Sequence, residues 1–169
     1  MRKSRKGAHR IASTAVAAAM LAGCVANPQT ADEFRKTASE GGRVTTFDVI
    51  RPFRDVAGAF RSKAPECLNA TVREVHQTGT AMWMTVRVYK PTVLVNDKRA
   101  ELQLRLHYEG LSIGQPPEGY YVFVADATPA GGGKTHVGIY SSTSYDNVTR
   151  AVTGWVTGKN IGCPDLSKN

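Results

Sequence analysis

Three histidines are the side chains best suited to acid–base chemistry in this sequence. His76, His107 and His136 fall on three separate predicted strands, and their spacing does not bring them together. Histidine is the usual general acid or base because its pKa lies near neutrality, but a catalytic group also needs partners within hydrogen-bond reach. Asp126 and Asp146 show no spacing that would join them to a histidine. We therefore expect no catalytic residues and no enzyme, and a hydrolase remains the alternative that would need such a cluster.

A glycine-rich segment is the second candidate for chemistry. Residues 131–135 read GGGKT, which is close to a phosphate-binding loop. That loop needs a glycine five residues before Gly133, where Thr128 stands, and a helix immediately after it, where the pattern predicts a strand. We therefore predict a hairpin turn, with no nucleotide, other cofactor or metal. The sequence also lacks GxSxG and HExxH motifs.

The most specific motif lies at the N-terminus. A cluster of basic residues precedes an apolar run, residues 11–23, that is too short to span a bilayer. The run ends in Leu21, Ala22, Gly23 and Cys24, and this LAGC segment resembles the lipobox of bacterial lipoproteins. The resemblance implies a lipoprotein signal peptide over residues 1–23 and lipidation of Cys24 by a diacylglycerol, often with a further acyl chain such as palmitate. Two acyl chains suffice for stable attachment to a membrane.

The same resemblance predicts the location of the mature protein. Val25 follows Cys24, whereas an aspartate there favours the inner membrane in enteric-type bacteria. The lipoprotein pathway therefore implies the periplasmic side of the outer membrane, with the inner membrane as the less favoured alternative. Removal of the signal peptide takes five basic residues and lowers the formal net charge from +8 to +3. The charge then gives no argument for nucleic-acid binding.

Two further cysteines, Cys67 and Cys163, remain as thiols in the mature chain. The periplasm that the lipobox implies is oxidising, so we expect a disulfide bond between them. A reactive thiol or a metal site is the alternative. No CxxC motif or nearby Cys/His cluster supports either.

Residues 24–42 read as a lipidated tether, since they contain few large apolar side chains, with a short helix over residues 31–39 as an option. A flexible tether of this length would have a root-mean-square reach of roughly 25 Å. The folded domain is expected over residues 43–169. It begins with a β-branched strand, residues 44–50, and a helix that Pro52 opens and Pro65 ends, which places Cys67 just beyond the helix.

Period-two alternation predicts about five antiparallel strands after this helix. They cover residues 71–76, 81–90, 101–108, 120–126 and 135–141. Pro91 interrupts the second of these, so its continuation over residues 92–95 either bends or lies at a sheet edge. A second helix over residues 144–157 places Trp155 on an apolar inner face. The order predicts an α+β fold, a curved antiparallel sheet of about six strands with two helices packed on one face.

This order of elements is similar to the helix-grip arrangement of some ligand carriers and of a lipoprotein of the outer-membrane barrel-assembly machinery. A likeness of fold implies no function.

Alternation also predicts a docking surface. Trp83, Arg87 and Tyr89 share one face of a strand, and Arg105 and His107 share the polar face of the return strand. If the two faces coincide, aromatic and basic groups lie together, as they do in protein interfaces. A solvated sheet face, or burial under the second helix, is the alternative.

We expect a membrane-anchored, non-enzymatic lipoprotein that binds a protein partner in envelope assembly or secretion. A carrier of a lipid or another apolar ligand is the alternative, and a cell-envelope hydrolase is the second. In a carrier, Met82 and Met84 would lie beside Tyr120, Phe123 and Trp155 and form a deformable pocket, although the same residues would suit an ordinary core.

Overall fold

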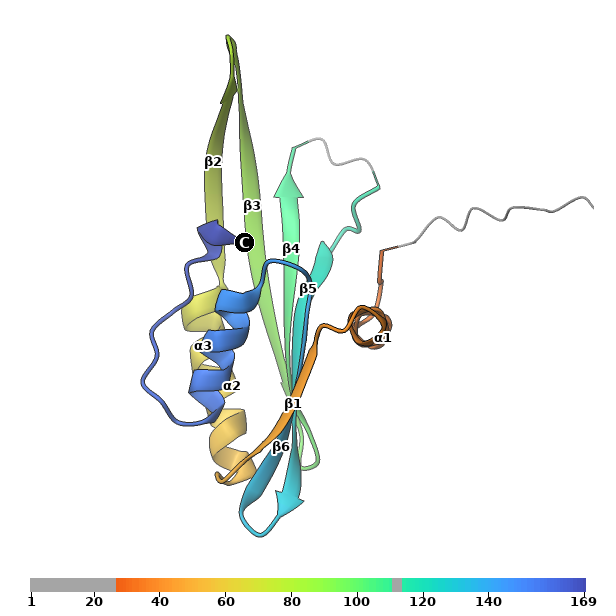
Figure 1. Ribbon diagram of the computed structural model, residues 1–169, viewed down its shortest axis with the longest axis vertical. Helices are drawn as coiled ribbons and strands as arrows, with labels where there is room; N and C mark the ends of the chain where they lie inside the picture. Colours follow the sequence, from red (N-terminus) through yellow and green to blue (C-terminus); the bar gives the residue numbers. More distant parts are fainter. Residues whose placement is uncertain (1–26, 111–113) are drawn as a thin grey trace, which may run out of the picture.

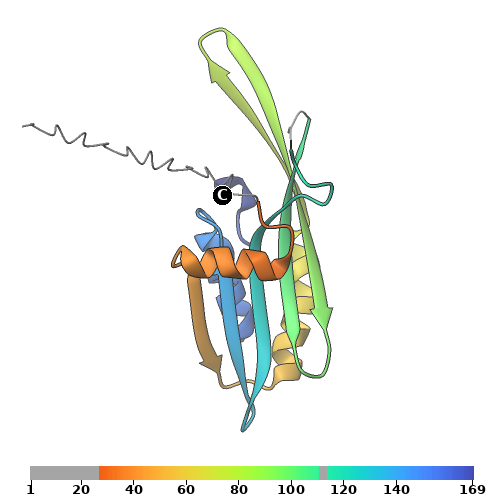
Figure 2. The same ribbon diagram turned by 90° about the vertical axis from the view of Figure 1, so that its right-hand side faces the viewer.

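A single antiparallel sheet of six strands organises the molecule (Figures 1 and 2). This computed structural model describes residues 27–110 and 114–169, so the predicted signal peptide and Cys24 lie outside the described residues. The strand order is β1-β6-β5-β4-β3-β2. The strands are β1 (Val44–Val49), β2 (Ala70–Thr78), β3 (Ala81–Val95), β4 (Ala100–Glu109), β5 (Tyr120–Gly131) and β6 (Lys134–Ser141). The helices are α1 (Ala31–Glu40), α2 (Phe53–Leu68), α3 (Asp146–Val156) and the short 3₁₀ helix η1 (Leu166–Lys168).

The prediction of an α+β fold around a curved antiparallel sheet is confirmed at this level. Within the described residues, no helix has the length and apolar character needed to cross a membrane.

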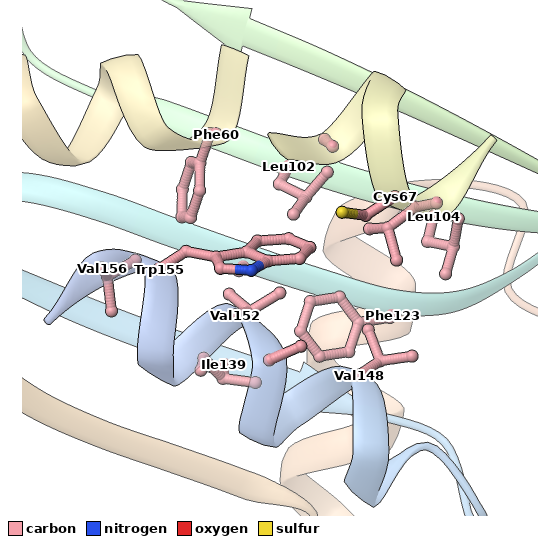
Figure 3. Close-up of a cluster of buried hydrophobic side chains, with 14 of the residues drawn as sticks. Phe60, Cys67, Leu102, Leu104, Phe123, Ile139, Val148, Val152, Trp155 and Val156 are labelled. Carbon is pink, nitrogen blue, oxygen red and sulfur yellow. The ribbon is translucent and has the colours of Figure 1, made fainter. Parts of the chain in front are cut away.

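The main core contains side chains of α2, α3 and the sheet (Figure 3). Phe60 of α2 and Val152 of α3 are fully buried, as are Leu102 and Leu104 of β4. Trp155 lies among them and donates its indole N–H to the carbonyl oxygen of Ile161 at 3.2 Å. Burial of such side chains is the dominant stabilising contribution to a fold of this size.

Helix α1 packs against the opposite face of the sheet from α2 and α3 (Figure 1). It begins with a capping box, in which the Thr30 hydroxyl accepts from the backbone N–H of Glu33 and the Glu33 carboxylate accepts from the backbone N–H of Thr30. Phe34 and Ala38, one turn apart, are buried against Val124 of β5. The structure therefore differs from the predicted tether, because residues 31–40 belong to the folded domain.

Ion pairs strengthen this attachment of α1. The guanidinium of Arg35 donates to Asp126 at 2.8 Å and to Glu101 at 2.5 Å, and Arg99 pairs with the same two carboxylates at 2.8 Å. The side chains of Arg35, Glu101 and Asp126 are at most 16% exposed. Burial by itself would lower the pKa of Arg35, but the hydrogen bond and charge of Asp126, with those of Glu101, outweigh it and raise that pKa.

We expect an Arg35→Met variant to release α1 from the sheet. Two nearly buried carboxylates would keep Arg99 as their only cation, and removing one partner of a buried ion pair typically costs about 3–5 kcal/mol. Amide hydrogen exchange in α1 should accelerate by tenfold or more, while exchange in α2 stays slow. Lys36→Met is the matched control, because Lys36 is 78% exposed on the same helix. Unchanged exchange in α1 of the Arg35→Met variant would contradict this role.

Two prolines act differently from one another. Pro65 lies inside α2, which continues to Leu68, so the prediction that Pro65 ends the helix is wrong. Cys67 and Leu68 of this last turn are buried in the core, and that packing outweighs the loss of one backbone hydrogen bond.

Pro91 lies in β3 beyond Tyr89, the last residue that pairs with β2. It therefore lies at a sheet edge, which is one of the two alternatives predicted from the sequence.

The predicted disulfide bond between Cys67 and Cys163 is present. It joins the last turn of α2 to the segment that follows α3.

The hairpin turn at residues 131–133 also forms as predicted, with three glycines at positive φ between β5 and β6. Strand β6 begins at Lys134, so this turn does not lead into the helix N-terminus on which a phosphate-binding loop depends.

Candidate binding arm

The β2–β3 hairpin extends beyond the rest of the sheet (Figures 1 and 2). The pair Val86↔Glu109 is the last between β3 and β4, so within the described residues no strand pairs with residues 81–85 of β3 on that side. These five residues correspond to about 17 Å of strand. Of the strands in the described chain, β3 alone pairs with β2, although η1 also contacts β2. We call residues 74–85 the arm; it is a two-stranded ribbon with both edges open.

The base of the arm is fixed by a buried arginine. Arg87 is 6% exposed and donates to Glu74 across the hairpin and to the Tyr89 hydroxyl at 3.2 Å. It also donates to the backbone carbonyl oxygens of Ser167, at 3.2 Å, and Asn169. The C-terminal segment is thereby tied to β2 and β3 where the arm leaves the domain.

The end of the arm, residues 75–84, exposes four large apolar side chains. Val75, Met82 and Met84 lie on one face with 66%, 69% and 58% of their surfaces exposed. On the other face Trp83 is 51% exposed and stacks on His76 with ring centroids 5.4 Å apart. No Asp, Glu, Lys or Arg occurs in residues 75–85. Exposed apolar groups concentrated in this way indicate an interaction site.

The docking surface predicted from alternation does not form. Tyr89 pairs with Leu106, and Lys90 pairs with Arg105. This register puts Tyr89 on the core face with the leucines of β4, whereas Arg105 and His107 belong to the opposite face. Arg87 and Tyr89 are buried, so of the three residues predicted on β3 Trp83 alone is substantially exposed.

The residues on the opposite face have local partners. Arg105 lies over the ring of Tyr121, 4.8 Å from its centroid, and donates to the Tyr121 hydroxyl at 3.0 Å. The ring of His107 is hydrogen-bonded to the side chain of Gln115 at 2.8 Å. These contacts bind the two side chains to the domain itself.

The histidines do not converge. His76 belongs to the arm, His107 to β4 and His136 to β6. His136 pairs with Asp48 of β1 at 2.7 Å, and both side chains are exposed. In the described part of the chain, no Ser, Thr or Cys side chain is hydrogen-bonded to His136. This arrangement is an acid–base pair without an activated nucleophile.

Asp126 forms ion pairs with Arg35 and Arg99, and Asp146 is the first residue of α3. Cys67, Cys163 and Glu66 lie close together, but both sulfurs form the disulfide and are not free thiolate ligands.

Met82 and Met84 lie apart from the core residues that they were predicted to join. Met82 and Met84 are on the arm, whereas Phe123 and Trp155 are buried in the core. A hollow of about 580 Å³ lies between α3 and the segment after it, outside the sheet–helix interface, with Arg150 and Asp165 in its wall. The prediction that Met82 and Met84 lie beside Phe123 and Trp155 in a carrier pocket is therefore wrong.

No protein-family model matches this sequence, and no curated protein is significantly similar to it. Function must be inferred from the chain itself, and the arm is the feature that sequence reasoning missed. A signal for it was present, because the predicted strand over residues 81–90, together with its continuation over residues 92–95, is longer than the return strand over residues 101–108. One end of the longer strand therefore had to extend past its neighbour.

Proposed function

We propose that this protein is a lipid-anchored, non-enzymatic docking module of the bacterial envelope, which binds a partner protein by strand addition to β2. The open edge of β2 is the observation that carries this proposal. A partner in extended conformation would pair with the free backbone groups of the edge, and side-chain pockets beside it would set specificity.

The composition of β2 supports this use. Natural edge strands are usually protected by proline, charged side chains, a bulge or very short length. Strand β2 is nine residues long, contains no proline, and pairs with β3 without a register shift. Its two charged residues are Arg73 and Glu74, and Glu74 accepts a hydrogen bond from Arg87. The other edge strand, β1, has six residues. The open edge of β2 is therefore longer than that of β1 and offers more backbone groups to a partner strand. Arg87 and the C-terminal segment hold its base in place.

The anchor is proposed from the lipobox, residues 21–24, with lipidation at Cys24 and attachment to the periplasmic side of the outer membrane. The disulfide supports an oxidising compartment. The order of elements from β1 to α3 supports a helix-grip-like arrangement, in which α2 and α3 share one core cluster with the sheet. A role in envelope assembly or secretion would suit a docking module of this kind.

Site-specific photo-cross-linking in intact cells tests the docking proposal. A photoreactive phenylalanine analogue at Thr71, exposed on β2, should give a discrete protein adduct about tenfold stronger than the analogue at Thr46 gives. Thr46 is the matched control because it is an exposed threonine on the other edge strand, β1. Proline at Thr71 should abolish capture by an analogue at Arg73. Equal labelling at both edges, or no adduct at Thr71, would refute strand addition to β2.

A further inference from the structure

The packing of α1 shortens the link between the membrane and the folded domain. A flexible tether over residues 24–42 would let the domain move freely, but α1 begins at Ala31 and packs on the sheet through Phe34 and Ala38. With Cys24 lipidated, two residues, Val25 and Ala26, separate the anchor from Asn27, so the Cα atoms of Cys24 and Asn27 lie at most about 10 Å apart. This argument rests on the lipid anchor of the proposed function.

The arm projects from the end of the domain toward which residues 27–30 run. In both views these residues, the described part of the chain before α1, lead from the helix toward that end (Figures 1 and 2). The loop between β1 and α2 lies at the other end. An anchor within about 10 Å of Asn27 therefore favours a bilayer on the side of the arm.

The chemistry of the arm suits the boundary between lipid headgroups and acyl chains. Tryptophan prefers this depth because its ring is apolar while its N–H can be hydrated. The exposed apolar side chains on the face opposite Trp83 are Val75, Met82 and Met84, and residues 75–85 contain no Asp, Glu, Lys or Arg to oppose their burial. The two open edges exclude deeper insertion, because unpaired backbone groups are not tolerated in hydrocarbon.

We propose that residues 75–84 insert into the headgroup boundary of the membrane that holds Cys24. The arm is then a second attachment point, and it fixes the orientation of the domain on the bilayer. The loop between β1 and α2 faces away from the membrane. The lower part of the β2 edge, which includes Thr71, stays in the aqueous layer next to the membrane, where a partner strand can reach it.

Tryptophan quenching in vesicles tests this orientation. The lipidated protein is reconstituted into vesicles of phosphatidylethanolamine and phosphatidylglycerol whose acyl chains carry bromine, which quenches nearby indoles. Emission from Trp83 should fall about twofold relative to unbrominated vesicles, as expected for an indole at the interface. Trp83 emission is taken as the difference between wild type and a Trp83→Phe variant. In that variant the remaining Trp155 is 3% exposed and should not be quenched.

A matched reporter at the other end separates insertion from mere proximity. Ile50 is 87% exposed in the loop between β1 and α2, and Ile50→Trp in the Trp83→Phe background should be unquenched. Quenching at Ile50→Trp that equals or exceeds quenching at Trp83 overturns the orientation. An unquenched Trp83 in protein that co-floats with vesicles overturns insertion but leaves the anchor intact, whereas protein that does not co-float refutes the anchor itself.

Discussion

Replacing Cys24 with serine behind a cleavable secretory signal should move the protein from the membrane to the soluble periplasmic fraction. Each buried methylene of an acyl chain contributes about 0.8 kcal/mol, so two chains hold a protein essentially permanently. The contacts proposed for the arm are far smaller and reversible. Fractionation after osmotic shock, with mass measurement of the N-terminal peptide, checks both the location and the lipid.

Val25→Asp is the matched control for this experiment. It keeps the cysteine and therefore the lipid, so the protein should stay membrane-bound in an enteric-type host, with the inner membrane as its expected location. Wild-type protein that osmotic shock or a high-salt wash releases would show that LAGC is not a lipidation site. The proposed anchor and the orientation of the arm would then both fail.

Periodicity predicted the elements well because it depends on neighbouring residues in the chain. The alternation of leucines with polar residues in β4 located a strand, and the apolar spacing around Trp155 located α3. The register between two strands could not be predicted in the same way, because it depends on how the strands align with each other. Whether Arg105 shares a face with Tyr89 depends on the length of the turn at residues 96–99, and the register makes Lys90 its partner. The predicted docking surface failed at this step.

Helix α1 was underestimated because little of its attachment is apolar. Phe34 and Ala38 are its two buried side chains, and its sequence otherwise resembles a solvated linker. The ion pairs of Arg35 with Asp126 and Glu101 join residues 91 and 66 positions apart in the chain. Nothing in the sequence near Arg35 indicates such partners, because charged residues on a short helix are usually solvated.

A Cys67→Ala/Cys163→Ala variant should lose much of its stability. The bond closes a loop of 96 residues, and the chain-entropy estimate for a loop of this size is on the order of 4 kcal/mol, less any strain. A loss of this size is a large fraction of the 5–15 kcal/mol by which typical domains are stable. Urea unfolding followed by tryptophan fluorescence measures the change, and wild type under reducing conditions is the control. An unfolding midpoint equal to that of oxidised wild type would contradict a stabilising role.

The same variant should also loosen the arm. Cys163 anchors the segment that carries Leu166, whose carbonyl oxygen accepts from the Tyr89 hydroxyl at 3.3 Å, and Ser167, whose carbonyl oxygen accepts from Arg87. Without the disulfide, η1 is held by these contacts, the burial of Leu166 and weaker surface interactions, so it should detach before the sheet unfolds. Arg87 would then keep its hydrogen bonds to Glu74 and Tyr89 but lose those to the C-terminal segment. Amide exchange in residues 74–85 should therefore rise more than exchange in β5. Equal acceleration in the two strands would mean that the disulfide stabilises the domain as a whole and does not support the base of the arm specifically.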